Sequence, residues 1–183
     1  QITHAGKQVT GVVTASGKTL QADMVASNGD LVHSYGLIAD SAVAARRLRG
    51  LKRKRWSPSL FVLHFGIKGS WPGIPHHMIL FGPRYRELIA EIFKGPDLPD
   101  DFSLYLHAPT RTDPSLAPEG CDAFYVLAPV PHLASADIDW EVEGPRYRDR
   151  ILAYLEERYI PGLTADLDTC RIFTPVDFRD QLN

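Results

Sequence analysis

The sequence predicts an α+β fold, in which a mostly antiparallel mixed sheet is flanked by helices. Short apolar runs of about four to eight residues, bounded by Gly and Pro, are typical of strands and recur along the chain. The clearest amphipathic helical segments follow pairs of strands instead of alternating with single strands, which favours α+β over a parallel α/β architecture. A chain of 183 residues, 44% of them hydrophobic, has room for one ordinary domain or slightly more.

The first 30 residues predict a hairpin that leads into a returning strand. Val9–Thr14 is the outgoing strand, Ser16 and Gly17 form the turn, and the return runs from Leu20 to an apolar end at Met24–Ser27.

The returning strand breaks at a cluster of turn-forming residues, Ser27-Asn28-Gly29-Asp30. This composition is typical of a tight turn with a positive φ at Asn28 or Gly29. Asp30 or Ser34 is a candidate N-cap for a following helix. The turn is either simply solvated or brings the backbone close to a bound ligand, and the residues alone leave both interpretations open.

A strongly basic segment covers residues 40–55, with Asp40 or Ser41 as the candidate N-cap of a helix. Seven of the ten residues from Arg46 to Arg55 are Lys or Arg. A solvated helix, an anionic membrane surface and nucleic acid are three interpretations of such a run. A net charge of −2 and the lack of a nucleic-acid-binding motif argue against nucleic acid as a partner.

Residues 59–66, SLFVLHFG, give the clearest strand pattern in the chain. Both sets of alternating side chains are mostly apolar, so we expect a central strand that is covered on both faces. A short strand, His77–Phe81, and a helix over residues 83–94 follow, with Pro83 at the first helical position.

Two further strands, Phe102–His107 and Ala123–Pro129, surround a loop rich in Pro and Gly. In the first strand, alternation places Phe102 with the core-facing leucines, whereas Tyr105 and His107 share an amphipathic face. That second face would suit the wall of a pocket better than open water. The remaining chain predicts a helix over residues 143–158 and a short strand that runs into a Pro turn.

The chain contains none of the common catalytic or nucleotide-binding motifs. It has no GxGxxG, P-loop, GxSxG or HExxH pattern. His76 and His77 invite a metal hypothesis, but adjacent strand residues point to opposite faces and no third ligand follows at a recognisable spacing, so no metal is expected. Cys121 and Cys170 are predicted to be free thiols. The residues alone therefore indicate an α+β domain and name no reaction.

As continuous strings, several segments closely resemble bacterial-type phytoene desaturases, carotenoid-synthesis members of the FAD-dependent amine-oxidase-like superfamily. The similarity is collinear along the chain and is most specific in the loop and strand PSLAPEG…VLAPVPH. Its other segments are GVVTASGKTLQADMVASNGDLVHSY, SLFVLHFG, HHMILFGPRYRELIAEIFKG, WEVEGPRYRDRILAYLEERYIPGL and FTPVDFRDQLN.

The resemblance implies that the chain is an internal portion of a flavoprotein oxidoreductase. Residues 1–30 would be the hairpin and return strand that end the FAD-binding domain, and residues 31–183 an incomplete substrate-binding domain. The FAD-binding Rossmann segment and a C-terminal flavin segment of the family are missing from this chain, so the chain alone is expected to bind no FAD and to be inactive. Asn28 and Asp30 are the candidates for contact with the cofactor, although the family usually has Ala where this chain has Gly29.

The implied reaction is the stepwise dehydrogenation of phytoene towards lycopene, with FAD as the hydride acceptor. An apolar substrate must be held by shape and buried area, which favours aromatic strand faces. The candidate substrate-binding residues are Phe65, Phe102, Tyr105, His107, Phe124 and Tyr125.

Because phytoene is held in bilayers, we expect a cytoplasmic protein that associates peripherally with a membrane. The candidate membrane-facing residues are Arg53, Lys54, Arg55, Trp56 and Trp71. A carotenoid cis–trans isomerase, a shorter-chain isoprenoid desaturase and a non-enzymatic module that binds apolar ligands are the alternatives.

Overall fold

A computed structural model describes residues 1–38 and 40–182, and the chain divides into two compact units. The first unit consists of Gln1–Trp56 with the residues from Arg179 onward, and the second of Ser57–Phe178. Residues 31–56 therefore belong to the same unit as the N-terminal hairpin. The assignment of residues 1–30 to the end of a cofactor-binding domain stays a prediction.

The first unit contains the predicted hairpin, here part of a three-stranded antiparallel sheet, and two helices. Gly17 adopts a φ of 82° in the turn between the second and third strands, where a side chain would be strained. The predicted strand ending at Met24–Ser27 is wrong, because the backbone there pairs with no strand and Met24 is 88% exposed. The elements are β1 (Ile2–Ala5), β2 (Gln8–Val13), β3 (Thr19–Gln21), α1 (Leu31–Gly36) and α2 (Ala42–Leu51).

Both helices of this unit begin at capping residues that the sequence predicts. The Asp30 carboxylate accepts hydrogen bonds from the backbone N–H groups of Val32 and His33, at the start of α1. The Ser41 hydroxyl accepts one from Ala44 N–H at the start of α2. These contacts satisfy donors that the first helical turn leaves free.

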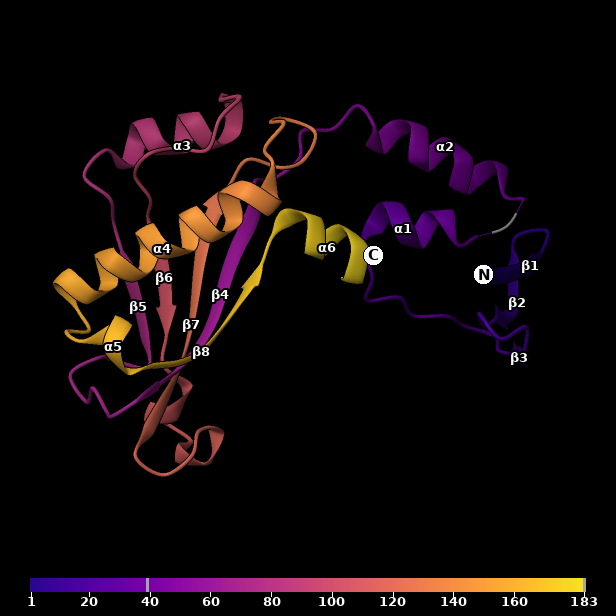
Figure 1. Cartoon of the computed structure of the whole chain (residues 1–183). Coiled ribbons are helices and arrows are strands. Elements are labelled where there is room, and N and C mark those ends of the chain that lie inside the picture. Colours follow the sequence, from indigo (N-terminus) through magenta and orange to yellow (C-terminus); the bar gives the residue numbers. More distant parts are fainter. Residues whose placement is uncertain (39, 183) are drawn as a thin grey trace. The chain divides into compact units, whose positions relative to one another are not determined.

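The second unit is built on a five-stranded antiparallel sheet in the order β5-β6-β7-β4-β8 (Figure 1). The two long strands β4 and β7 pair over ten residues each and form its centre. The α+β class with a mostly antiparallel sheet is therefore confirmed. The strands are β4 (Ser59–Lys68), β5 (His77–Leu80), β6 (Leu104–His107), β7 (Cys121–Val130) and β8 (Leu167–Phe173).

Helix α4 (Trp140–Arg158) lies across one face of this sheet (Figure 1). Alternate residues of the strands point towards it and are buried, since every second side chain of a strand faces the same way. Phe61 contacts two rings of α4, stacking against Trp140 with centroids 5.8 Å apart and meeting Tyr147 edge-on at 4.9 Å. The predicted helix over residues 143–158 thus begins three residues earlier, at a cap made by Asp139.

The remaining elements connect the sheet strands or follow the last of them. They are α3 (Tyr85–Lys94), the 3₁₀ helices η1 (Pro109–Arg111) and η2 (Pro114–Leu116), α5 (Leu163–Asp166) and α6 (Pro175–Leu182). Two expectations are wrong here: Pro83 precedes the N-cap Arg84 of α3, and the final Pro turn is the start of a helix, α6.

The expectation that β4 is covered on both faces holds only in part. Its position between β7 and β8 is interior, as predicted, but His64 on the second face is exposed. Ile79, on the same face of the edge strand β5, is 55% exposed. Within the described residues of this unit, the sheet therefore has one covered face and a second face that is exposed at His64 and Ile79 but buried at Val62, which is 2% exposed. We call the second one the open face.

Candidate functional site

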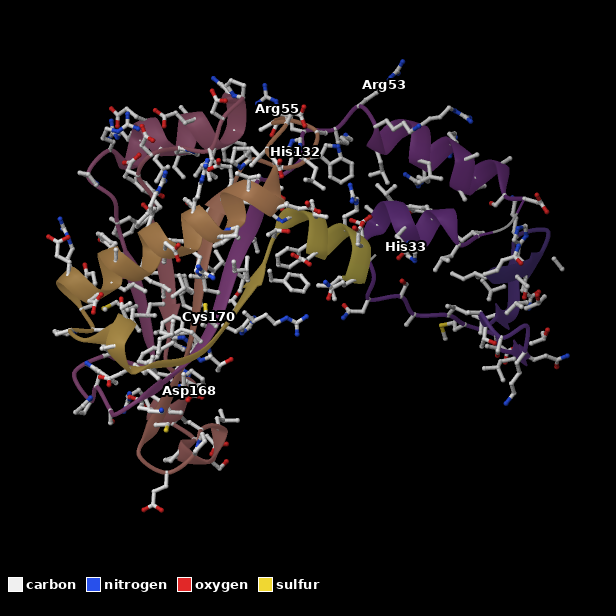
Figure 2. The ribbon with its side chains drawn as sticks, viewed as in Figure 1. His33, Arg53, Arg55, His132, Asp168 and Cys170 are labelled. Atoms are coloured by element: carbon white, nitrogen blue, oxygen red, sulfur yellow. The ribbon has the colours of Figure 1, made fainter. Side chains whose placement is uncertain are left out.

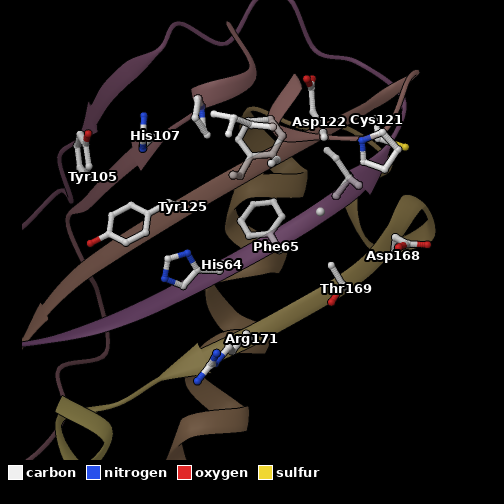
Figure 3. Close-up of a pocket in the computed structure, with 18 residues that line it drawn as sticks. His64, Phe65, Tyr105, His107, Cys121, Asp122, Tyr125, Asp168, Thr169 and Arg171 are labelled. Carbon is white, nitrogen blue, oxygen red and sulfur yellow. The ribbon is translucent and has the colours of Figure 1, made fainter. Parts of the chain in front are cut away.

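The open face of the sheet carries a row of polar and aromatic side chains with one member from each strand. Directly paired residues on neighbouring strands point to the same side of a sheet. The register pairs His77 with His107, His107 with Tyr125, Tyr125 with His64, and His64 with Arg171. The result is a continuous line across the sheet, His77–His107–Tyr125–His64–Arg171, and Figure 3 shows four of its members in succession.

A second row lies beside the first and is mostly apolar. It runs through Ile79, Tyr105, Leu127, Val62 and Phe173, again with direct pairing at each step. The two rows touch at Tyr105, whose ring lies 6.0 Å from that of Tyr125. The open face therefore presents a hydrophobic strip next to groups that donate and accept hydrogen bonds.

A cavity of about 760 Å³ lies over this face and under the loop that contains η1 and η2 (Figure 3). The sheet contributes Tyr105, His107, Tyr125, His64 and Arg171 to its wall. The loop contributes an apolar set, Pro109, Leu116, Ala117 and Pro118. Its volume lies within the range of small-molecule sites, and a mostly apolar lining with a few polar groups is typical of them.

A buried ion pair fastens the loop to the sheet. Asp122 of β7 is 3% exposed and accepts hydrogen bonds from Thr110 Oγ1 at 2.9 Å, from Trp71 N–H at 2.9 Å and from the Arg111 guanidinium. Burial alone would raise the pKa of Asp122, but the hydrogen bonds from Trp71, Thr110 and Arg111 outweigh it and hold this pKa below its ordinary value. Asp122 therefore stays ionised and positions the roof of the cavity.

Two groups in the polar row have shifted pKa values. His64 is exposed in part, but the burial of the rest of its side chain lowers its pKa, and the positive charge of Arg171 lowers this pKa further. Burial raises the pKa of Tyr125, with a smaller contribution from Tyr105. At neutral pH the row therefore offers a neutral imidazole, able to accept a proton, beside a protonated phenol, with ring centroids 5.0 Å apart.

Three histidines meet at one end of the polar row, where β5 begins and β6 ends. The candidate ligand atoms of His76, His77 and His107 all lie within 4.8 Å of one another. The sequence-based argument against a metal assumed that His76 and His77 alternate on a strand and lack a third partner. Both premises are wrong, because β5 begins only at His77 and the β-sheet pairing brings in His107.

The structure divides the six predicted substrate-binding residues into three groups. Tyr105, His107 and Tyr125 line the cavity from the open face. Phe65 and Phe124 also border the cavity but are 3% exposed and stack on each other in the core, with centroids 5.3 Å apart. Phe102 does not line this cavity, because its ring meets the α4 tyrosines Tyr147 and Tyr154 edge-on, and its contact with substrate stays a prediction.

Sequence reasoning missed His64, Arg171 and the loop residue Leu116 as parts of this site. His64 shares the alternation pattern of the open face, but a single histidine in an apolar strand is usually just a packed residue. The signal that distinguishes it is the pairing of β4 with both β7 and β8, which the sequence does not display.

The candidate cofactor contacts do not form a built flavin site. The Asp30 carboxylate is used as the cap of α1, and Asn28 is exposed. Neither side chain lies in a buried cradle made by the described residues. A contact between the backbone of the turn and a cofactor stays a prediction.

The candidate membrane-facing residues differ in exposure. Arg53, Lys54 and Arg55 are exposed in the segment after α2, where Figure 2 labels two of them, and Trp56 is 42% exposed. Trp71, in contrast, is half-buried, packs against the core of the second unit and lies over Gly69. Among the described helices, none is both long enough and apolar enough to span a bilayer. Both cysteines are free, as predicted.

The fold is shared with a known oxidoreductase. A crystal structure of an oxidoreductase from Methanosarcina mazei matches 94% of this chain and 36% of its own length, with a TM-score of 0.60 and 17% identity. At that identity the likeness concerns the fold alone. No protein-family model matches the chain.

Sequence relatives narrow the class considerably. The chain is 62% identical over 179 residues to a lycopene-forming phytoene desaturase of Paracoccus sp., and 55% identical over 184 residues to one of Pseudescherichia vulneris. These matches cover 97% and 100% of this chain. The chain spans 36% and 37% of the length of these two relatives. The resemblance to bacterial phytoene desaturases is thereby confirmed.

Proposed function

We propose that this chain is part of an FAD-dependent desaturase that dehydrogenates phytoene stepwise towards lycopene. The observation that carries the proposal is the identity of 62% and 55%, over nearly the whole chain, to two lycopene-forming phytoene desaturases. The matches cover 97% and 100% of this chain, so the matched stretches include the loop that roofs the cavity and the strands beneath it.

Within that enzyme, the open face is the wall of the substrate site. Phytoene is a long hydrocarbon without a polar handle, so affinity must come from buried apolar area, at roughly 25 cal/mol per Å². The apolar row through Ile79, Tyr105 and Leu127 supplies such a surface, and Tyr105 also lines the cavity together with the loop residues Leu116 and Pro118. This chain therefore contributes one wall of the proposed substrate site.

The polar row explains why the wall is more than a hydrophobic strip. Each desaturation removes two hydrogens from a saturated C–C bond beside a polyene, one as a hydride and one as a proton. FAD supplies the hydride acceptor when the whole protein binds it. From this chain, the neutral His64 imidazole can take up the proton, and the Tyr125 phenol lies beside it.

The basic segment after α2 fits the need to reach a substrate that is held in lipid. Arg53, Lys54 and Arg55 are exposed and contiguous with the exposed Trp56. Each basic residue near an anionic bilayer contributes about 1 kcal/mol, and tryptophan suits the headgroup level. We therefore propose a cytoplasmic enzyme that docks peripherally through Arg53–Trp56, with Trp71 left out of that surface.

Product analysis with the full-length protein tests the proposal. Protein, FAD and phytoene-loaded anionic liposomes should yield products that have lost hydrogens. Tyr125→Ala should lower the rate at least tenfold, whereas Asp149→Asn, an exposed change on α4 away from the cavity, should not. A product of unchanged mass would support an isomerase instead. Conversion of a shorter isoprenoid but not of phytoene would support a shorter-chain isoprenoid desaturase. Binding of a polyene without turnover would support a non-enzymatic binding module.

A further inference from the structure

We propose that His76, His77 and His107 form a binding site for a divalent transition-metal ion of the Zn²⁺ class. The site would have three imidazole ligands and a fourth position open to water or another small ligand. The proposal does not depend on the desaturase activity, since it concerns one edge of the sheet and is tested by metal binding alone.

The three rings already lie close to the spacing that a metal requires. Zn–N bonds of about 2.1 Å in tetrahedral geometry place ligand nitrogens roughly 3.4 Å apart. Here the candidate atoms are all within 4.8 Å of one another, and the Nε2 atoms of His76 and His107 are 2.9 Å apart. Small side-chain rotations are therefore enough to bring all three nitrogens to one ion.

The hydrogen bonds around the cluster orient two of the rings towards its centre. His76 Nδ1 contacts the Thr112 hydroxyl, and His77 Nδ1 lies 2.7 Å from the Tyr105 hydroxyl. Each contact uses Nδ1 and leaves Nε2 on the other side of the ring, and for His76 this Nε2 faces that of His107 inside the cluster. Histidines that bind metals are generally held in this way by a second hydrogen bond, which sets both the tautomer and the ring orientation.

The backbone holds the three ligands in place. His77 and His107 are directly paired residues of β5 and β6, and Ala108 N–H donates to the His76 carbonyl at 2.9 Å, which continues the pairing by one residue. Thr112 is the C-terminal cap of η1, so its contact with His76 also ties the cluster to the loop over the cavity. The ligands thus come from a paired strand edge, which is more rigid than a free loop.

Stacked imidazoles without an ion are a poor alternative account of the cluster. The hydrogen bonds recorded for its rings go to two hydroxyls and to each other, and ring centroids lie 4.2 to 5.0 Å apart. Protonating these rings would place positive charges side by side. Neutral imidazoles are the form that Zn²⁺ takes, and His77 is exposed enough for an ion to enter.

Metal binding can be measured on the chain without a polyhistidine tag. Titration with Zn²⁺ by calorimetry should show one saturable site, and Co²⁺ should give the visible absorption of a tetrahedral imidazole complex. His77→Gln and His107→Gln should each weaken binding at least tenfold. His64→Gln is the matched control, because it removes a histidine from the same face outside the cluster and should leave affinity unchanged.

A variant of a residue that orients one of the ligands keeps the test decisive if a ligand variant fails to fold. Tyr105→Phe removes the hydroxyl that orients His77 and should weaken Zn²⁺ binding by about tenfold. Zn²⁺ should also raise the melting temperature of the wild type and not that of His77→Gln. The proposal is overturned if the wild type shows no saturable Zn²⁺ binding, if Co²⁺ gives only an octahedral spectrum, or if His64→Gln lowers affinity as much as His77→Gln.

Discussion

The covered and open faces of the five-stranded sheet are made by the same strands, yet their side chains serve opposite purposes. On the covered face, Phe61, Leu63, Leu106 and Val126 have no exposed surface and pack beneath α4. On the open face, the same strands carry His64, Tyr125 and His107, which pair directly across the sheet. Ile79, on the edge strand β5, is 55% exposed.

This difference separates stability from function along each strand. The covered face removes apolar area from water within the second unit, so its side chains carry the folding free energy. The open face keeps histidine, tyrosine and arginine in a line where they cost folding free energy or contribute little to it. Antiparallel sheets commonly have one packed and one solvated face, and the open face is the one we propose for a ligand.

The largest effect on stability should come from the covered face. Phe61→Ala removes a ring that contacts Trp140 and Tyr147, and leaves a cavity under α4. We expect a loss of about 3–5 kcal/mol in the free energy of unfolding, measured by urea denaturation. A loss below about 1 kcal/mol would mean that α4 is not closed on this face as described.

Asp122→Asn should have the next largest effect. It removes the charge that pairs with Arg111 in a buried setting and weakens the hold on the loop over the cavity. The expected loss is about 1–3 kcal/mol. Asp168→Asn is the control, because its partner Lys68 is exposed and such surface pairs contribute about 0–1 kcal/mol. Equal losses for the two variants would contradict the anchoring role of Asp122.

The separation between the faces could be predicted only in part from the sequence. Alternation places Tyr105 and His107 opposite Leu104 and Leu106, and the structure agrees. The same alternation puts Phe102 on the core side, so its assignment to the substrate wall came from its aromatic character alone. The two-residue period of a strand therefore predicts the face on which Phe102 lies better than its aromatic character does.

The rows across the open face could not be predicted, because they depend on strand register. His64 and Arg171 meet only since β8, late in the chain, pairs with β4. His76 and His107 meet for the same reason at the other edge, where β5 pairs with β6. Local patterns give the faces of a strand, whereas the composition of a site needs the long-range pairing.

Tyr125→Ala should reverse the order of effects seen on the covered face. The side chain is half-exposed and lies on the open face, so the free energy of unfolding should fall by about 1 kcal/mol or less. Turnover of phytoene by the full-length protein should fall at least tenfold, because the ring contacts both rows. A stable variant with normal turnover would show that the open face is not part of the substrate site.

The smallest effect concerns the protonation of His64. Because burial and then Arg171 lower the pKa of His64 below its ordinary value of 6.5, the unfolded chain binds this proton first as the pH falls. The contribution of neutral His64 to the free energy of unfolding is therefore complete above pH 6.5. This contribution is lost as the pH decreases through the folded-state pKa of His64. An NMR titration of the His64 ring should give a pKa below 6.5 in the wild type, and Arg171→Gln should raise it. An unchanged pKa in that variant would show that burial alone sets the charge state of this row, and that the end of the row at β8 does not influence its centre.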